Sequence, residues 1–284
     1  MRSPCTKLNR RFPRRRVFIT GASSGLGLEL ARALAREGWV LGLFDRNVER
    51  LASVEADLSS SGVRVLAYPG DVTHPEELTV AVNSFADIND GLDVMINNAG
   101  VASAGTLMEV PLEDWRWILD INLMGVVHGA RAALPHLQRN GRGLMINVAS
   151  AAAFTSTPGL ISYNVSKAAV LSLSETLSGE LRDSKTQVSV VMPTFFRSGL
   201  LESFRGPPDF LGKAMHLMAS SNYRVEEVAR DVLKQAGAGK THIVLPASAR
   251  WLWRLKRLTP RYFLSCVLAL REKTRPRLAD PPPA

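Results

Sequence analysis

Tyr163 and Lys167 are the two residues in this sequence whose types and spacing point most directly to catalysis. They are four positions apart in a segment with helical periodicity, so both side chains should lie on one helix face. A phenol with an ordinary pKa near ~10 is a poor base at neutral pH. A lysine ammonium about 4 Å away would favour the phenolate by up to ~4 kcal/mol at an effective dielectric of about 20. The pair therefore indicates a tyrosine acid/base, although ordinary helix surfaces also carry Tyr and Lys at this spacing.

Two further polar residues can reach the same cleft. Ser150 follows the apolar run at 144–149, and a hydroxyl at the carboxyl end of a strand can donate to a substrate carbonyl oxygen. Asn122 lies inside an apolar helical segment, where its amide needs a hydrogen-bond partner. The simpler interpretation of Asn122 is a buried amide that is bonded to the backbone.

A glycine-rich turn, TGASSGLG, occupies residues 20–27 between the first apolar run and the first helical segment. Glycines permit a tight turn there and let the backbone approach a pyrophosphate at the helix N-terminus. Glycine-rich turns without ligands are common, but this position between strand and helix indicates dinucleotide binding. The spacing differs from GxGxxG, which indicates a particular branch of dinucleotide folds.

Asp45 ends the second apolar run, 24 residues after Gly21. An acid there can accept hydrogen bonds from the adenosine-ribose hydroxyls and repel a 2′-phosphate. It can also be an ordinary turn residue. Arg46 could bind a 2′-phosphate instead, whereas Ser24 offers no positive charge for one. We expect NAD as the cofactor, with NADP through Arg46 as the alternative.

Short aliphatic runs alternate with helix-period segments along the chain, and several runs are apolar throughout. This pattern predicts an α/β, doubly wound Rossmann fold: a parallel seven-stranded sheet with helices on both faces. Ligands of such sheets bind outside the carboxyl ends of the strands. The predicted strands are 17–20, 40–44, 63–68, 92–96, 144–148, 188–192 and 241–245, and the predicted helices are 26–37, 49–60, 75–88, 112–137, 163–181 and 225–236.

Taken together and in this order, the motifs resemble the short-chain dehydrogenase/reductase (SDR) family across roughly residues 16–246. The resemblance rests on TGxxxGxG at 20–27, NNAG at 97–100 and YxxxK at 163–167. It implies that Tyr163 exchanges a proton with the substrate oxygen and that Lys167 binds the nicotinamide ribose and lowers the pKa of Tyr163. It also implies that Ser150 orients the substrate oxygen and that Asn122 helps hold a relay water near Lys167.

The resemblance also implies a set of cofactor-binding residues, among them Asp71 and Val72 at the adenine ring. Where the family usually has Pro-Gly and a threonine four residues beyond the Gly, this chain has Pro193-Thr194 and then Ser198. The two cysteines lack metal-ligand spacing with the five histidines, so we expect no metal. The full cofactor set is Gly21, Ser23, Ser24, Gly25, Leu26, Gly27, Asp45, Arg46, Asp71, Val72, Asn98, Ala99, Gly100, Tyr163, Lys167, Pro193, Phe196 and Ser198.

A connection of about thirty residues, 193–223, follows the sixth predicted strand and is unusually apolar. Long connections of this kind are often active-site lids. We therefore expect an NAD(P)-dependent oxidoreductase that interconverts a secondary alcohol and a ketone, or a primary alcohol and an aldehyde, on a lipophilic substrate. Equally, these side chains could only pack the lid onto the body. The alternatives are a non-catalytic dinucleotide-binding sensor or scaffold, or an epimerase or dehydratase that retains its NAD.

The formal net charge of +9 resides at the chain ends. Residues 1–16 carry seven Lys/Arg and no acid, and residues 250–284 carry nine against two acids. We interpret residues 1–15 as a solvated basic extension, 16–246 as the catalytic domain and 247–284 as a basic amphipathic tail. The acidic body argues against nucleic acid as a partner. No secretory signal or apolar run of 18 residues is seen, which favours a cytoplasmic protein, with membrane association as an option.

The tail has two adjacent helical stripes and a second helix expected to start at Pro260. Short amphipathic helices rich in aromatic and basic residues suit the interface of an anionic membrane, and the predicted contact spans 250–277. The alternative is that the tail covers the chain's own lid or a partner subunit. Residues 280–284 should be disordered, and the resemblance favours a homodimer or homotetramer through 112–137 and 163–181. The stripes are Arg250, Arg254, Arg257 and Arg261, and Trp251, Leu255, Leu258 and Tyr262.

Overall fold

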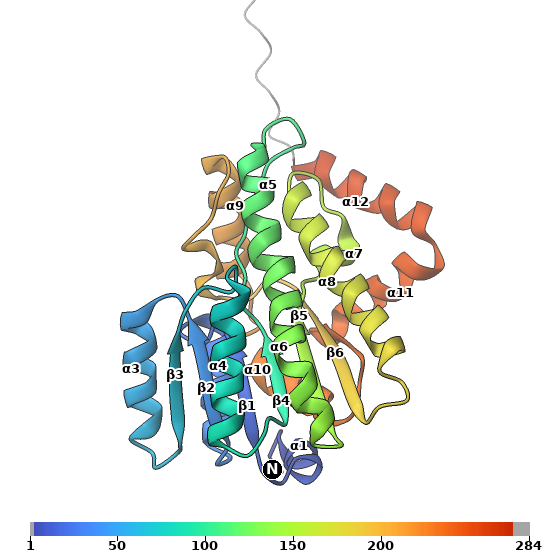
Figure 1. The fold of residues 1–284 in the computed structure, drawn as a ribbon. Helices are drawn as coiled ribbons and strands as arrows, with labels where there is room; N and C mark the ends of the chain where they lie inside the picture. Colours follow the sequence, from blue (N-terminus) through green and yellow to red (C-terminus); the bar gives the residue numbers. More distant parts are fainter. Residues whose placement is uncertain (1–2, 275–284) are drawn as a thin grey trace, which may run out of the picture.

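The computed structural model describes residues 3–274, and in this range seven parallel strands form one sheet in the order β3-β2-β1-β4-β5-β6-β7 (Figure 1). The strand order reverses between β1 and β4, so the predicted doubly wound fold is confirmed. Asn97 of β4 lies opposite Asn147 of β5 in the parallel pairing, so the carboxyl ends of these two strands lie at the same edge of the sheet. The strands are β1 Arg16–Thr20, β2 Val40–Asp45, β3 Val65–Pro69, β4 Val94–Asn97, β5 Gly143–Val148, β6 Thr186–Pro193 and β7 His242–Leu245.

Helices cover both faces of the sheet because its central strands are buried on both sides (Figure 1). One face carries α1 Thr6–Arg11, α2 Gly25–Ala35, α3 Val48–Ser59 and α10 Val225–Gly237. The other face carries α4 Pro75–Ile88, α5 Leu112–Leu119, α6 Gly125–Arg139 and α8 Ile161–Glu180.

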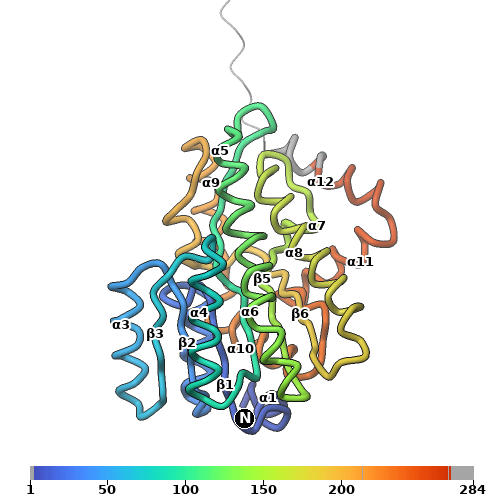
Figure 2. The backbone as a smooth tube through the Cα atoms, viewed as in Figure 1, coloured from blue at the N-terminus to red at the C-terminus, as the bar shows by residue number. Residues whose placement is uncertain are grey.

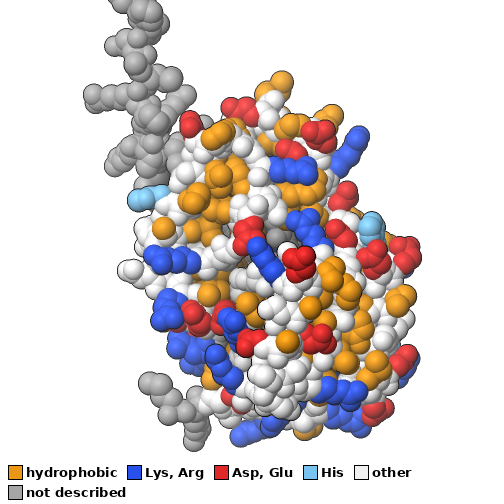
Figure 3. All heavy atoms as spheres, turned by 90° about the vertical axis from the view of Figure 1, so that its left-hand side faces the viewer, with side chains coloured by type: hydrophobic (Ala, Val, Ile, Leu, Met, Phe, Trp, Pro, Cys, Tyr) orange, Lys and Arg blue, Asp and Glu red, His pale blue; other side chains and the backbone are white. Residues whose placement is uncertain are grey.

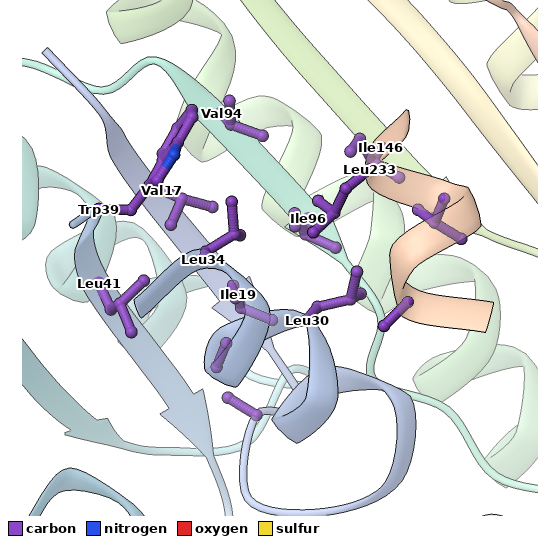
Figure 4. Packing of buried hydrophobic residues seen from close by; sticks show 14 of the residues in the cluster. Val17, Ile19, Leu30, Leu34, Trp39, Leu41, Val94, Ile96, Ile146 and Leu233 are labelled. Atoms are coloured by element: carbon purple, nitrogen blue, oxygen red, sulfur yellow. The ribbon is translucent and has the colours of Figure 1, made fainter. Parts of the chain in front are cut away.

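The packing of α2 on the sheet fixes the turn that precedes this helix. Leu30 and Leu34 of α2 are fully buried against Ile19 and its neighbours (Figure 4). Each such leucine contributes about 1.5–3 kcal/mol of transfer free energy. Trp39, also fully buried, follows α2 and donates from Nε1 to Asn9 Oδ1 at 2.8 Å. The N-terminus of α2 is therefore held firmly at the carboxyl end of β1.

The prediction of a solvated N-terminal extension is wrong for its described part. Cys5 and Leu8 are fully buried and Phe12 is 2% exposed. Arg11 donates from Nη1 to Ala236 O at 3.1 Å, at the carboxyl end of α10. The three apolar residues are spaced by three and four positions, so they form one helix face. The sequence prediction missed this apolar helix face because basic residues dominate the composition of the segment.

The predicted helix over 112–137 is also corrected. It is divided into α5, a π-helical turn at Asp120–Met124 and α6. The π-helical turn contains Asn122, whose side chain is bonded to Val101 of the loop after β4. Such single π-helical turns are often found at functional sites.

The long connection after β6 contains structure of its own. A 3-10 turn at Gly199–Leu201 is followed by α9 Pro208–Ala219. We call residues 193–223 the lid. The short helix α7 Ala152–Thr155 precedes α8.

The tail forms α11 Arg250–Leu258 after a 3-10 turn at Ala247–Ala249, and then α12 Pro260–Thr274, so the predicted start of the second helix is confirmed (Figure 2). Trp253 of α11 packs edge-on against Phe154 of α7, with ring centroids 5.3 Å apart, and contacts His242 of β7 at 5.5 Å. This attachment is to α7 and β7, not to the lid. The predicted disordered end, 280–284, lies outside the described residues. None of the helices within 3–274 is both long and apolar enough to cross a membrane.

Candidate active site

Strand β5 and helix α8 bring three predicted catalytic side chains together. Lys167 is 3% exposed, donates from Nζ to Val148 O at 3.2 Å and lies 5.8 Å from the centre of the Tyr163 ring. Ser150 follows β5, and its hydroxyl is close enough to the Tyr163 phenol to act on the pKa of that phenol. A hydroxyl, a phenol and an ammonium therefore meet at the carboxyl edge of the sheet, where ligands of doubly wound folds bind.

Burial is the largest influence on the pKa values of Tyr163 and Lys167. It lowers the pKa of Lys167 to about 8. It also raises the pKa of Tyr163 above its ordinary value, and the hydrogen bond with Ser150 opposes that increase. The expected lowering of the Tyr163 pKa by Lys167 is not found, because desolvation outweighs the opposing effect of Ser150. A phenol in this state is protonated at neutral pH and can donate its proton.

Asn122 is fully buried in the π-helical turn beside this group. Its Oδ1 accepts from Val101 N–H at 2.8 Å, and its Nδ2 donates to Val101 O at 3.0 Å and to Ser166 Oγ of α8 at 3.1 Å. The bonds to Val101 match the simpler interpretation of a backbone-bonded amide. A Cβ on Gly100 would lie 3.1 Å from Asn122 Oδ1 and 3.2 Å from Lys167 Nζ, so all three residues border the same small space.

The NNAG segment holds the glycine-rich turn in place. Asn98 Nδ2 donates to the carbonyl oxygens of Thr20 and Gly21, both at 3.0 Å, and Thr20 Oγ1 accepts from the N–H groups of Asn98 and Ala99, both at 3.1 Å. Gly21 has a φ of +63°, and a Cβ there would lie 2.8 Å from Ala99 Cα. A Cβ on Gly27 would overlap Gly21 O. The turn therefore requires glycine at both positions.

The residues around this turn fit a dinucleotide. Helix α2 starts at Gly25 with no side-chain cap from Ser24 and no acid in its first turn, so its N-terminus suits a pyrophosphate. Asp45 Oδ2 accepts from Ser23 N–H at 3.0 Å, which places a carboxylate beside the turn for a ribose hydroxyl. Leu26 points into the core and is 5% exposed, so only its backbone can serve the cofactor.

The predicted adenine contacts lie after β3. Asp71 Oδ1 accepts from the N–H and the hydroxyl of Thr73, both at 2.9 Å. Val72 is 7% exposed, and a Cβ on Gly125 of α6 would lie 2.9 Å from Val72 Cγ2. These contacts fix the backbone of 71–72 near the carboxyl end of the sheet.

The start of the lid lies over the glycine turn. Pro193 O accepts from Ala151 N–H at 2.8 Å, and Phe196 packs against the core on the α2 side. A Cβ on Gly25 would lie 3.5 Å from Ser198 Cβ, so Ser198 is placed at the cofactor turn. Thr194 has no left-handed backbone, and its N–H donates to Leu245 O at 2.9 Å. The departure from Pro-Gly therefore causes no strain here.

Two lid residues that the sequence did not identify reach the cofactor end of the site. Arg46 Nη2 donates to Ser203 Oγ at 2.9 Å, and Arg50 Nη1 donates to Glu202 Oε2 at 2.5 Å. The only sequence signal was that Glu202 is one of just two acids, with Asp209, in a segment rich in apolar residues.

Backbone hydrogen bonds connect the lid to the neighbouring loops. Ala104 N–H donates to Arg205 O at 3.0 Å, Arg205 N–H to Ala102 O at 3.3 Å, and Gly105 N–H to Gly159 O at 2.8 Å. The lid, the loop after β4 and the loop after α7 therefore form one continuous cover over the carboxyl end of the sheet.

The apolar side chains of the lid are divided between two environments. Met218 is buried, whereas Phe195, Met215 and Leu217 are exposed by 46%, 57% and 46%. Figure 3 shows hydrophobic side chains gathered on the upper part of the face that includes α9. Packing onto the body therefore explains only part of the lid's apolar character.

Other parts of the described chain are weaker candidates. A hollow of about 660 Å³ opens at the amino end of the sheet, opposite the catalytic group. Two of its arginines are already paired with aspartates: Arg16 with Asp93 at 2.8 Å and Arg14 with Asp90 at 2.6 Å. Within residues 3–274, no group of three or more His, Cys, Asp or Glu side chains is arranged to hold a metal.

Comparison with known proteins agrees with the geometry. A family model described as short chain dehydrogenase matches residues 15–207. D-beta-hydroxybutyrate dehydrogenase of Rhizobium meliloti (strain 1021) is 35% identical over 189 residues, 66% of this chain and 73% of that protein. Nodulation protein G of Rhizobium sp. (strain N33) is 31% identical over 189 residues, 66% of this chain and 76% of that protein.

Solved structures are similar over most of the chain. A short chain dehydrogenase/reductase from Burkholderia phymatum in complex with NAD has a TM-score of 0.81 and 26% identity, and the match covers 95% of this chain and 98% of that one. An alcohol dehydrogenase from the archaeon Thermococcus sibiricus, complexed with 5-hydroxy-NADP, has a TM-score of 0.72 and 27% identity, with 81% and 95% covered.

Proposed function

This chain belongs to the short-chain dehydrogenase/reductase family, and on that basis we propose that it interconverts an alcohol and a carbonyl compound with Tyr163 as general acid/base. The family makes it an oxidoreductase that binds a nicotinamide dinucleotide. The substrate pair is a secondary alcohol and a ketone, or a primary alcohol and an aldehyde. The observation that carries the proposal is the buried Lys167 ammonium 5.8 Å from the centre of the Tyr163 ring, next to Ser150 at the carboxyl end of β5.

In the reductive direction the Tyr163 phenol donates its proton to the carbonyl oxygen, and in the oxidative direction its phenolate accepts the alcohol proton. Ser150 hydrogen-bonds the same substrate oxygen and stabilises its developing charge. The nicotinamide ring supplies the hydride chemistry when bound. The raised pKa of Tyr163 keeps the phenol protonated at neutral pH, which is the form needed for the reductive direction. With the dinucleotide bound, Lys167 would hold the nicotinamide ribose, and Asn122 would help hold a relay water near Lys167.

The substrate we propose is lipophilic, since exposed Phe195, Met215 and Leu217 give the lid an apolar surface beyond what packing requires. Purified protein with NAD should form NADH faster from long-chain or polycyclic alcohols than from short polar ones. The Ser150→Ala variant measures the NADH formation that does not depend on the proposed site. The opposite preference would contradict a lipophilic substrate. Dinucleotide binding without NADH formation from any alcohol would favour the sensor or scaffold, or an epimerase or dehydratase that keeps its cofactor.

For the cofactor we propose a preference for NAD. The Asp45 carboxylate beside the glycine turn supports it, because a 2′-phosphate would be repelled there. Arg46, the residue that could favour NADP, is engaged by Ser203 of the lid.

We also propose self-association as a homodimer or homotetramer through the helices α6 and α8. Support comes from Met124, next to α6, and Val165 of α8, which are apolar yet exposed by 39% and 44%. The cytoplasmic location expected from the sequence stays a prediction.

A second proposal concerns the tail, which we infer makes peripheral contact with an anionic membrane. Of the predicted apolar stripe, Leu255 is partly buried, but Trp251, Leu258 and Tyr262 are exposed by 59%, 81% and 64%. Arg254, Arg257 and Arg261 are exposed beside them, and residues 232–271 contain no acid. Each basic residue near an anionic leaflet contributes about 1 kcal/mol of attraction.

Flotation of the full chain with vesicles tests this contact. The chain should bind vesicles that contain phosphatidylglycerol but not vesicles of pure phosphatidylcholine, and added salt should weaken the binding. Binding should be lost when Trp251, Leu258 and Tyr262 are changed to Gln. Gln at Leu107, Met108 and Leu112, exposed by 62%, 91% and 75%, is the matched control and should leave binding intact. Equal flotation of both variants and the wild type would rule out the tail as the contact.

A further inference from the structure

Glu202 places a carboxylate from the lid at the cofactor end of the site. Its Oε2 accepts from Arg50 Nη1 at 2.5 Å. Its Oε1 lies 2.8 Å from where a Cβ on Gly199 would be, and Ser24 Oγ lies 3.6 Å from that same point. Because residue 199 has no side chain, the carboxylate can fold back toward the glycine turn.

The neighbouring guanidinium is held by the lid as well. Arg46 follows Asp45 directly and donates to the hydroxyl of Ser203, at 2.9 Å. Two arginines near the carboxyl end of β2 are therefore bonded to two consecutive lid residues. A 2′-phosphate on the adenosine ribose would need such guanidinium groups as its partners, since arginine binds phosphate through paired N–H donors.

We propose that Glu202 is a specificity-determining residue that favours NAD over NADP by engaging Arg50 and by adding a second carboxylate to that of Asp45. This inference rests on the dinucleotide binding of the proposed function and not on turnover. Glu202 acts on the ribose end of the cofactor site and takes no part in the chemistry at Tyr163.

The solvent exposure of the Arg50–Glu202 ion pair limits how strongly it can favour NAD over NADP. The side chains of Arg50 and Glu202 are 49% and 52% exposed, so water and salt screen their attraction. A 2′-phosphate can then compete for Arg50 at a moderate cost. The structure therefore predicts a bias between the two dinucleotides and not an absolute exclusion of NADP.

Dissociation constants of NADH and NADPH, measured by fluorescence titration of the full chain, test the proposal. Glu202→Gln keeps the size of the side chain but removes its charge. It should strengthen NADPH binding about three- to tenfold and change NADH binding by less than about twofold. Asp209→Asn is the control, because Asp209 is another exposed lid acid and makes no ion pair in the described structure. It should leave both constants unchanged.

The role of Arg50 provides the second comparison. Arg50→Met should weaken NADPH binding in the Glu202→Gln background and remove the gain. A gain that persists without Arg50 would contradict the part of the proposal that assigns Arg50 to the 2′-phosphate, and an equal gain for NADH and NADPH would contradict a role of Glu202 in specificity altogether. Failure of the wild-type chain to bind either dinucleotide would instead contradict the proposed function itself.

Discussion

Lys167 is a cation with 3% of its surface exposed, and no carboxylate pairs with it in the described structure. Burial lowers its pKa from 10.5 to about 8. The unfolded chain therefore binds more protons than the native chain between these values, so the free energy of unfolding rises with pH across this interval. Below pH 8 the full cost of burying the charge is present. Such a cost is typical of a residue kept for function, not for stability.

Lys167→Met should therefore stabilise the protein at pH 7 while it abolishes oxidoreductase activity. We expect a gain in the free energy of unfolding of about 1–3 kcal/mol, after allowing for the bond to Val148 O that is lost. Chemical denaturation at pH 7 and pH 10 measures it. The gain should shrink at the higher pH, because the wild type has by then lost the Lys167 proton. A variant that is less stable at both pH values would contradict this account.

How much of the site could be predicted also differs from residue to residue. Tyr163 and Lys167 could be placed on one helix face from their spacing alone. The direction of the Tyr163 pKa shift could not be predicted, because it depends on how deeply the fold buries the phenol. The contact of Arg50 with Glu202 joins positions 152 residues apart, which no local pattern can reveal.

At the scale of elements, the strands were predicted closely because buried parallel strands are continuous apolar runs. Two of the elements that were missed, α1 and the π-helical turn, escaped prediction for separate physical reasons. Helix α1 has only three apolar anchors among many arginines, so composition suggested solvent. The π-helical turn in Asp120–Met124 keeps helical periodicity, and only the tertiary bonds of Asn122 mark it.

The lid depends on elements on both sides of it. Its backbone is bonded to the loop after β4, which is itself bonded to the loop after α7, and its side chains reach the arginines after β2. The lid thus contacts both the substrate end and the adenosine end of the cleft. The affinity for the dinucleotide and the shape of the substrate site should therefore be coupled, as the proposal for Glu202 implies.

For the whole molecule, the parallel sheet is what assembles the site. Residues from four distant parts of the chain meet because β1, β2, β4 and β5 end at one edge (Figure 1). The excess of positive over negative charge lies elsewhere, on α1 and on the tail helices. The catalytic group and the basic ends of the chain therefore lie in different parts of the molecule.

The most direct test of the central claim is Tyr163→Phe, measured by NADH formation from the best alcohol of the panel and by NADH binding. The change removes one hydroxyl and keeps the ring that packs beside Lys167. Turnover should fall by about 10²–10⁴-fold, as expected for loss of a general acid/base, while the dissociation constant of NADH should stay within about threefold. A variant that keeps more than about a tenth of the wild-type turnover would contradict the assignment of Tyr163 as the acid/base.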